Sequence, residues 1–490
     1  MGRKRSSCRD HFKKYLILKK ENSIIQKGDD NYMEEIPLKN LNHAEMPQIV
    51  TEVPGPRSRA IRTREDKHIS PGLSAVALIS GLAMSDGLGA LVRDVDGNIF
   101  IDFSSGAVVT VTGHSHPKVV EAIQSQIGKF VHIYDYGSDI RAEFLDLLAE
   151  TAPVGIDTFQ MFTAGAETVE GGMRLAKAAT KQHEFISLFR GFHGKTVGAL
   201  SAMGGNYKKG FGPLAAGIVQ TPNAYCYRCP LNLTFPSCNV ACADFIENVF
   251  EQQTTGQVAA VMLEAIQGAG GVIVPPAEFM TKIQAFCKRN NILLFVDEVL
   301  TSAGRTGKMW ATDHYDIQPD IITMGKGIAS GFPLGIVGSS SKLMENWPWN
   351  QYNGGTSTFG GSPVSAAAAL ATLKVIKEEN LVEHGAALGF YIKSRLLLLK
   401  DKHISIGDVR GVGMLMAIEF VQSRDTKERI TQEQAEFLYR EILKRGVLVA
   451  SAAPIMRITP PLVLDEVLAD RALDLIGEAI SAFESKYHFG

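Results

Sequence analysis

The residues that decide the fold are NILLFVDEV, at positions 291–299. Five consecutive apolar residues, 292–296, precede the two acids Asp297 and Glu298. A short continuous apolar run is typical of a strand buried on both faces of a parallel sheet. Because α/β proteins bind ligands beyond the carboxyl ends of such strands, Asp297 is a candidate ligand-binding residue.

The chain on both sides of this stretch repeats a pattern of short apolar run, small-residue turn and helical periodicity. The expected strands are 158–162, 184–189, 258–263 and 292–296, and the expected helices are 167–179 and 276–289. Such alternation is typical of βαβ units. We therefore expect an α/β fold with a mostly parallel central sheet.

Composition excludes several classes of partner. The 490 residues carry 50 Lys+Arg and 52 Asp+Glu, a formal charge of -2, which argues against a nucleic acid or an anionic membrane as partner. No run of about 18 apolar residues predicts a membrane span, and six cysteines do not suggest a disulfide framework. We expect a cytoplasmic protein that acts on small molecules.

The N-terminal region, 1–45, differs from the rest. Residues 1–32 hold nine Lys or Arg against four Asp or Glu. The apolar run 15–18 is shorter than the roughly 7 to 15 residues of a secretory signal. We expect a basic, disordered arm.

Two further segments supply candidate binding groups. In PDIITMGKGI, residues 319–328, Lys326 follows a short apolar strand between two glycines, where it can form a Schiff base with a planar aldehyde. In FTAGAETVE, residues 162–170, a small-residue turn opens a helix whose free N–H groups can bind a phosphate. With Asp297 facing a ring nitrogen, these are the three anchors of pyridoxal 5'-phosphate.

An alternative reading of Asp297 is a Mg²⁺ ligand in an NTPase. RGFHGKT, residues 190–196, ends in Gly-Lys-Thr, as a P-loop does. However, a P-loop needs a glycine five positions before Gly194, where this chain has Phe189. A P-loop-like NTPase is therefore a distant alternative.

A series of short motifs occurs in the order found in one family. The motifs are 102–103 (DF), 113–117 (GHSHP), 164–167 (AGAE), 192–194 (FHG), 264–268 (EAIQG), 297–299 (DEV), 304–307 (GRTG), Lys326 and 358–363 (TFGGSP). From about residue 50 onward the chain resembles the class III (ω-type, subgroup II) pyridoxal-phosphate-dependent aminotransferases of fold-type I, in the 4-aminobutyrate aminotransferase-like branch. The resemblance implies a large domain at 105–380 and a small α+β domain built from 46–104 and 381–490.

The resemblance also implies roles for individual residues. Lys326 would hold the cofactor and move the proton between substrate and cofactor, and Asp297 would keep the pyridine nitrogen protonated. The phosphate would bind the amides of Gly165 and Ala166 and the hydroxyl of Thr358 from the neighbouring subunit. A homodimer, or a dimer of dimers, with composite sites follows.

Four more cofactor contacts are implied. Phe192 would stack on one face of the ring and Val299 on the other, with His193 and Glu264 also in the cofactor site. Together with the previous residues, they complete the expected cofactor pocket.

The implied substrate site departs from the family pattern. Arg457 matches the arginine that binds the α-carboxylate, and its planar fork suits that role. Ala269 occupies the position of the gate glutamate that neutralises this arginine in many relatives. Lys195 replaces an arginine that often binds the distal carboxylate. Leu300 replaces a glutamine that forms a hydrogen bond to the cofactor. Ala107 replaces the glutamine that is characteristic of a dialkylglycine decarboxylase.

The predicted activity is transfer of an amino group from an amino acid or a 4-aminobutyrate-like ω-amino acid to a 2-oxo acid, by a ping-pong mechanism through Lys326. An amino acid racemase or epimerase of the same fold is the alternative. It would use the same Lys326 and Asp297 but return the proton to Cα, and the sequence does not display that difference.

Four cysteines gather in one short segment: Cys226, Cys229, Cys238 and Cys242. Their spacing is compatible with a zinc knuckle. A similar segment occurs without a catalytic role in the branch that this chain resembles. Structural zinc, a disulfide and reduced loop thiols are the alternatives, and reduced thiols are expected.

Overall fold

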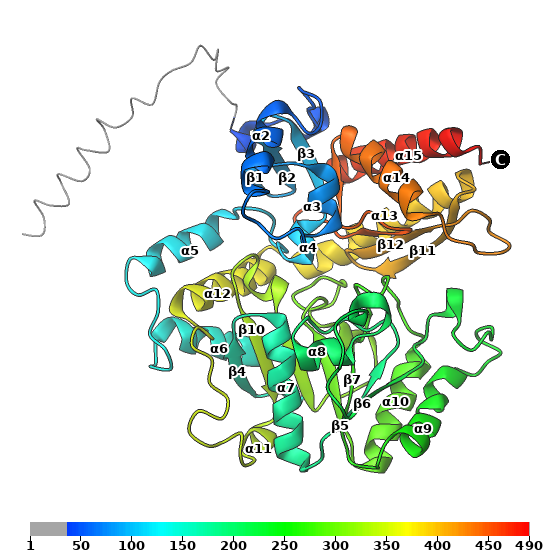
Figure 1. Cartoon of the computed structure of the whole chain (residues 1–490). Helices are drawn as coiled ribbons and strands as arrows, with labels where there is room; N and C mark the ends of the chain where they lie inside the picture. The colour runs from blue at the N-terminus through cyan, green and yellow to red at the C-terminus, as the bar shows by residue number, and fades with distance from the viewer. Residues whose placement is uncertain (1–36, 490) are drawn as a thin grey trace, which may run out of the picture. The chain divides into compact units, whose positions relative to one another are not determined.

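A seven-stranded sheet lies at the centre of the lower part of the molecule in Figure 1. The computed structural model describes residues 37–489. The strand order is β4-β10-β9-β8-β7-β5-β6, and only β10 runs antiparallel to its neighbours. The strands are β4 (Thr158–Phe162), β5 (Glu184–Leu188), β6 (Ile218–Thr221), β7 (Val258–Leu263), β8 (Leu293–Glu298), β9 (Ile321–Met324) and β10 (Gly335–Ser339). The expected mostly parallel sheet is confirmed.

Helices cover both faces of this sheet because its strands are apolar on both sides. On β7, Val261 and Leu263 pack in one core cluster with α9 (Ala241–Gln253) and α10 (Ala277–Asn290). The alternate residues of the same strand pack in a second cluster against α7 (Gly165–Thr180). Side chains alternate between faces along a strand, so the two clusters lie on opposite sides of the sheet.

The predicted elements agree closely with these strands and helices. The expected strands 158–162 and 258–263 match β4 and β7 at both ends. The expected helices 167–179 and 276–289 lie within one or two residues of α7 and α10. The expected strand 292–296 is too short, because β8 continues through Asp297 and Glu298, whose buried carboxylates have hydrogen-bond partners.

Of two smaller sheets, the first joins segments from the two ends of the chain and the second is built from C-terminal strands alone. The first contains β1 (Met84–Leu88), β2 (Leu91–Asp94), β3 (Ile99–Phe103) and β13 (Val447–Val449). In it, β13 pairs in parallel with β3. The second contains β11 (Ile406–Val412), β12 (Leu415–Phe420) and β14 (Ile455–Ile458). The N-terminal and C-terminal segments therefore share one sheet, while the domain boundaries given above stay predictions.

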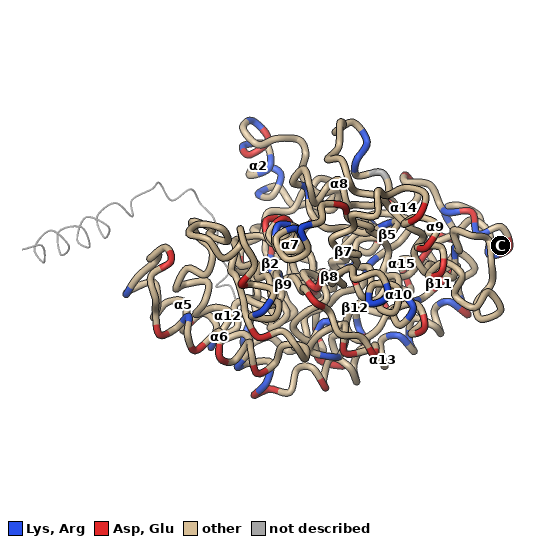
Figure 2. The backbone as a smooth tube through the Cα atoms, turned by 90° about the horizontal axis from the view of Figure 1, so that it is seen from below, with Lys and Arg blue, Asp and Glu red and all other residues tan. Residues whose placement is uncertain are grey.

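Short and long helices complete the described chain. They are α2 (Pro56–Glu65), α3 (Ala75–Ser80), α4 (Ser105–Val108), α5 (Pro117–Ile127), α6 (Asp139–Thr151), α8 (Val197–Ala202), α11 (Ser341–Met344), α12 (Pro363–Glu378), α13 (Leu381–Lys402), α14 (Gln432–Lys444) and α15 (Glu466–Tyr487). Between residues 37 and 489, no helix has the length and apolar character needed to cross a bilayer. Figure 2 shows basic and acidic residues interspersed along the chain.

Most of the predicted basic arm lies outside the described residues, which begin at 37. Its last part contains two short 3-10 helices, Leu38–Asn40 and His43–Glu45. His43 Nδ1 forms a hydrogen bond with the carboxylate of Asp465, just before α15.

Candidate active site

A cavity of about 190 Å³ lies at the carboxyl ends of the central strands. β8 ends in Asp297–Glu298, β9 is followed by Lys326, and α7 begins at Gly165. The cavity is lined by Gly165, Ala166, Phe192, His193, Gly194, Glu264, Ala269, Asp297, Val299, Leu300 and Lys326. The structure thus brings together every predicted cofactor residue except Thr358.

Asp297 is buried and held by three hydrogen bonds. Its Oδ2 accepts from His193 Nδ1 at 2.8 Å, and its Oδ1 accepts from Val299 N–H at 3.0 Å and Thr323 Oγ1 at 3.1 Å. Burial alone would lower the pKa of His193, but the hydrogen bond and charge of Asp297 together with the charge of Glu264 raise it. The other ring nitrogen, His193 Nε2, is buried without a partner among the described residues. These contacts hold the Asp297 carboxylate in a fixed position at the cavity.

Lys326 lines the same cavity, on the first turn after β9. Burial lowers the pKa of its amine, and the positive charge of Arg457 acts in the same direction. The carboxylates of Asp297 and Glu264 oppose this shift. A lysine with a lowered pKa carries more of the neutral amine, the form that attacks an aldehyde and accepts a proton.

The first turn of α7 provides an anion site. The helix begins after Ala164 without a side-chain cap, so its first N–H groups remain free for a ligand. Gly165 permits the close approach of Val299, because a Cβ at this position would lie 2.7 Å from Val299 Cγ1. A larger residue at 165 would displace Val299 or close the cavity.

Glu264 is buried beside Lys326 and Asp297. Its carboxylate accepts hydrogen bonds from the amides of Phe192 and Gly268, both at 2.9 Å. Burial raises its pKa to about 7, and the nearby negative charge of Asp297 contributes. Glu264 therefore joins the Phe192 segment to the loop after β7 and positions Phe192 at the cavity.

These residues fit pyridoxal 5'-phosphate. The cavity offers a lysine for the aldehyde, a buried carboxylate for a cationic ring nitrogen, and an uncapped helix start for the phosphate. Phe192 and Val299 supply apolar surface for a planar ring.

A second cavity, of about 270 Å³, meets the first at Ala269, which lines both. We call the first, which contains Lys326, the lysine cavity, and the second the arginine cavity. Its lining comprises Arg190, Tyr207, Ala269, Gly271, Arg429, Ser451, Ala453, Pro454, Ile455 and Arg457. Among the predicted substrate residues, Arg457 and Ala269 lie here. Sequence reasoning missed Arg190, Arg429 and Tyr207. The position of Arg190, two residues before Phe192, was a signal that could have found it.

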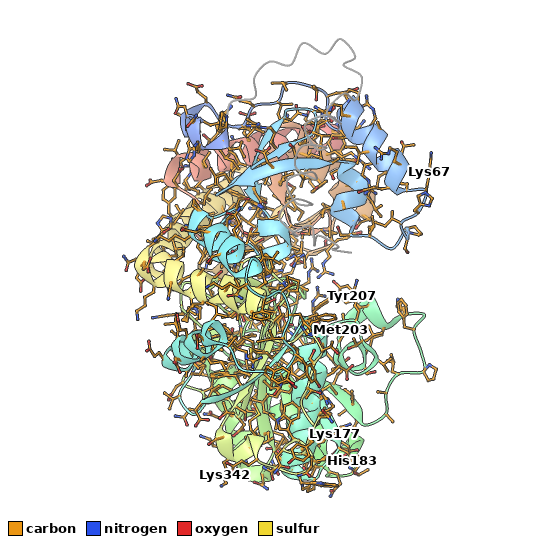
Figure 3. All side chains as sticks on the ribbon, turned by 90° about the vertical axis from the view of Figure 1, so that its left-hand side faces the viewer. Lys67, Lys177, His183, Met203, Tyr207 and Lys342 are labelled. Carbon is orange, nitrogen blue, oxygen red and sulfur yellow. The ribbon has the colours of Figure 1, made fainter. Side chains whose placement is uncertain are left out.

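Tyr207 reaches this second cavity from the short 3-10 helix Gly205–Lys208. Its ring contacts Phe192 edge-on, with centroids 5.3 Å apart. Figure 3 shows Tyr207 at the upper edge of the green part of the ribbon. Tyr207 therefore connects the expected ring-stacking residue to the arginine-lined cavity.

Three predicted residues lie away from both cavities in the single chain. Lys195, Ala107 and Thr358 are exposed, and none of them lines either cavity. Ala107 adopts a left-handed backbone conformation with φ of 71°. Next to Thr358, Ser357 Oγ donates a hydrogen bond to Glu167 Oε1 at 2.6 Å, which ties this segment to the first turn of α7.

The four cysteines of the loop line one small cavity of about 10 Å³ and are free thiols. Burial and the neighbouring thiols raise the pKa of Cys242 to about 11. Across residues 37–489, no group of three or more His, Cys, Asp or Glu side chains is arranged to hold a metal ion. The loop adds no group to the lysine cavity.

Comparisons with known proteins agree with this geometry. The family model of aminotransferase class-III matches residues 76–480. The chain is 35% identical over 448 residues to a 4-aminobutyrate aminotransferase from Mycobacterium leprae, covering 89% of this chain and 98% of that protein. It is 34% identical over 401 residues to a leucine/methionine racemase from Thermococcus litoralis, covering 81% and 89%. A solved (S)-enantioselective omega-transaminase from Thermomicrobium roseum has a TM-score of 0.81 and 30% identity, covering 86% of this chain and 98% of that one.

Proposed function

Because the chain belongs to the class-III aminotransferase family and is a pyridoxal-phosphate-dependent aminotransferase, we propose that it moves the amino group of an amino acid or a 4-aminobutyrate-like ω-amino acid to a 2-oxo acid by a ping-pong mechanism. The observation that supports this most is the convergence of Lys326, Asp297 and the start of α7 on one cavity.

The bound cofactor supplies an electron-withdrawing ring that stabilises the charge left when the substrate Cα loses its proton. Asp297 would face the ring nitrogen and favour its protonated form, because the carboxylate is buried and held by His193, Thr323 and the amide of Val299. Three partners on one carboxylate hold it in a single orientation, as electrostatic stabilisation requires.

Lys326 would hold the cofactor through its aldehyde and would move a proton at Nζ. Its lowered pKa favours the neutral amine needed to accept the proton. Arg457 binds the carboxylate of the substrate as a bidentate partner. With alanine at 269, none of the side chains lining the arginine cavity is a carboxylate that could neutralise Arg457.

We place the phosphate on the amides of Gly165 and Ala166 and on Thr358 of a second copy of the chain, in a homodimer or a dimer of dimers. Thr358 is exposed, next to Phe359, which is 61% exposed. Phe359 contacts His132, with ring centroids 5.2 Å apart. His132 lines a surface cavity of about 1010 Å³.

Large apolar side chains crowd this surface. Phe130 is 64% exposed and Tyr136 is 79% exposed, and both line the surface cavity. Exposed apolar patches of this kind are typical of protein interfaces. A second copy of the chain bound here would cover the patch and bring Thr358 of one chain to the cofactor cavity of the other.

A single-turnover experiment tests the proposed activity. Holoenzyme mixed with an amino donor, without a 2-oxo acid, should lose the absorbance of the lysine-bound cofactor and release an equivalent amount of the deaminated donor, which is a 2-oxo acid from an α-amino acid and an aldehyde acid from an ω-amino acid. Addition of a 2-oxo acid should restore the absorbance. A donor panel of 4-aminobutyrate, ornithine, β-alanine, branched-chain amino acids, glutamate and aspartate, without any such change, would contradict the proposal.

A racemase or epimerase is the second candidate, because leucine/methionine and alanine/serine racemases are similar to this chain at 34% and 33% identity. Single enantiomers of amino acids separate the two functions. A racemase inverts them without an amino acceptor, whereas an aminotransferase stops after one turnover.

A further inference from the structure

We propose that Arg190 binds a second carboxylate of the substrate, so that the arginine-lined cavity selects dicarboxylic amino acids and 2-oxo acids. The proposal rests on the proposed aminotransferase function and names its substrate class. Arg457 takes the first carboxylate, and Arg190 lines the same cavity of about 270 Å³.

Arg190 has no carboxylate partner within residues 37–489. Its Nε donates to the carbonyl of Gly270 at 2.8 Å, and its guanidinium stacks on the ring of Tyr225 at 5.3 Å. These two contacts fix the side chain, while neither terminal nitrogen forms a hydrogen bond to a described residue. An oriented, unpaired guanidinium is suited to bidentate recognition of a carboxylate.

The charged side chains near Arg190 include more arginines than carboxylates. Arg228, Arg410 and Arg429 all pair with the single buried carboxylate of Glu419. The only other carboxylate paired in this described group is Asp408, which binds Arg410 at 2.8 Å.

With Arg190, four arginines therefore face two carboxylates, beside a cavity that Arg457 also lines. Buried charge without a counter-ion is unfavourable, so the cavity attracts an anion.

Ala269 leaves the route between the lysine cavity and Arg190 free of a side-chain charge. It is the one residue that lines both described cavities, and its methyl group carries no carboxylate to compete for the arginines. The exposed Lys195, the residue expected from the family pattern to bind the distal carboxylate, lines neither cavity. Arg190 therefore lines the cavity in which the distal carboxylate would bind, and Lys195 does not.

Binding of glutarate, an inert dicarboxylate, to the holoenzyme tests the proposal by calorimetry. Butyrate, with one carboxylate, is the reference ligand. The wild type should bind glutarate at least about tenfold more tightly than butyrate, because a charge-assisted contact is gained. Arg190→Gln should remove that difference, and Arg190→Lys should keep part of it, since lysine retains the charge without the planar fork.

Steady-state kinetics supply a second readout, in which Arg190→Gln should raise the KM for 2-oxoglutarate at least about tenfold more than the KM for pyruvate. Arg440→Gln, which removes an exposed arginine of α14, is the matched charge control, and thermal melts check that each variant is folded.

A glutarate preference that survives in Arg190→Gln would overturn the proposal, whether or not Lys195→Gln removes it, as would a wild type without any preference. These ligand-binding outcomes do not depend on turnover. The single-turnover experiment can therefore fail, and refute aminotransfer, while the glutarate result stands.

Discussion

The two cavities that meet at Ala269 differ in how their charges are paired. In the lysine cavity, Asp297 is held by His193, Thr323 and a backbone amide, and Glu264 by two amides. In the arginine cavity, Arg190 and Arg457 donate only to backbone carbonyls. In the lysine cavity the two carboxylates have hydrogen-bond donors within the protein. In the arginine cavity Arg190 and Arg457 have no carboxylate partner among the described residues and are available to a bound ligand.

This difference corresponds to the residence time of the expected ligands. A cofactor that stays bound needs groups fixed in advance, which requires supporting hydrogen bonds. A substrate that enters and leaves in each cycle supplies its own counter-charge. Four predictions break or sharpen this contrast, beginning with the largest expected effect.

Lys326→Ala should abolish turnover and the absorbance of the lysine-bound cofactor together, because no other lysine lines the described cavity. Spectroscopy and a transamination assay on the same preparation measure both. Turnover retained in this variant would remove Lys326 from the mechanism.

Asp297→Asn should lower kcat by roughly 10²–10³-fold, as loss of one fixed electrostatic partner does in other enzymes. The side chain keeps its size, so the fold should remain intact and a thermal melt serves as the control. Normal kcat would show that the buried carboxylate does not stabilise the reacting ring.

Ala269→Glu should raise the KM for an α-amino acid by about tenfold, because the new carboxylate can pair with Arg457 or Arg190. The variant would give Arg190 or Arg457 a carboxylate partner within the cavity. Ala269→Gln, of similar size without the charge, is the matched control. Equal KM values in the two variants would mean that bulk, and not charge, acts at this position.

The smallest effect concerns the pH dependence of stability. The pKa of Glu264 is about 7 in the folded protein, above its ordinary value of 4.5, because of burial. Between these values the folded state keeps a proton that the unfolded chain has lost, so stability falls as pH rises through this range. Glu264→Gln cannot ionise and should lack this part of the fall.

Melting temperatures of cofactor-free protein at pH 5 and pH 8 test this sign. The wild type should lose more stability than Glu264→Gln between the two pH values, even though the variant loses one acceptor at both. An equal change in the two proteins would contradict the raised pKa.

The lysine cavity could be predicted because each of its anchors follows a local signal. Asp297 ends an apolar strand, Lys326 follows another, and Gly165 begins a helix after a small-residue turn. The arginine cavity joins Arg190, two residues before Phe192, to Arg429, which lies far away in the sequence and carries no local motif. Their meeting depends on how the small sheets pack, which strand and turn signals do not specify.

Resemblance to a family fixed the order of motifs but not the position of every side chain. Lys195 occupies the family position for the distal carboxylate, yet it is exposed in the described chain. The sequence also gave no sign that β10 alone would reverse direction in the central sheet.

The parallel pairing of β13 with β3 has a consequence for synthesis on the ribosome. β3 is translated before the seven-stranded sheet, and its neighbour β13 is translated after it. The strands of the seven-stranded sheet are all made in between. All residues that line the lysine cavity are therefore translated before Arg457 on β14. A chain cut off before β13 would carry the lysine cavity without Arg457.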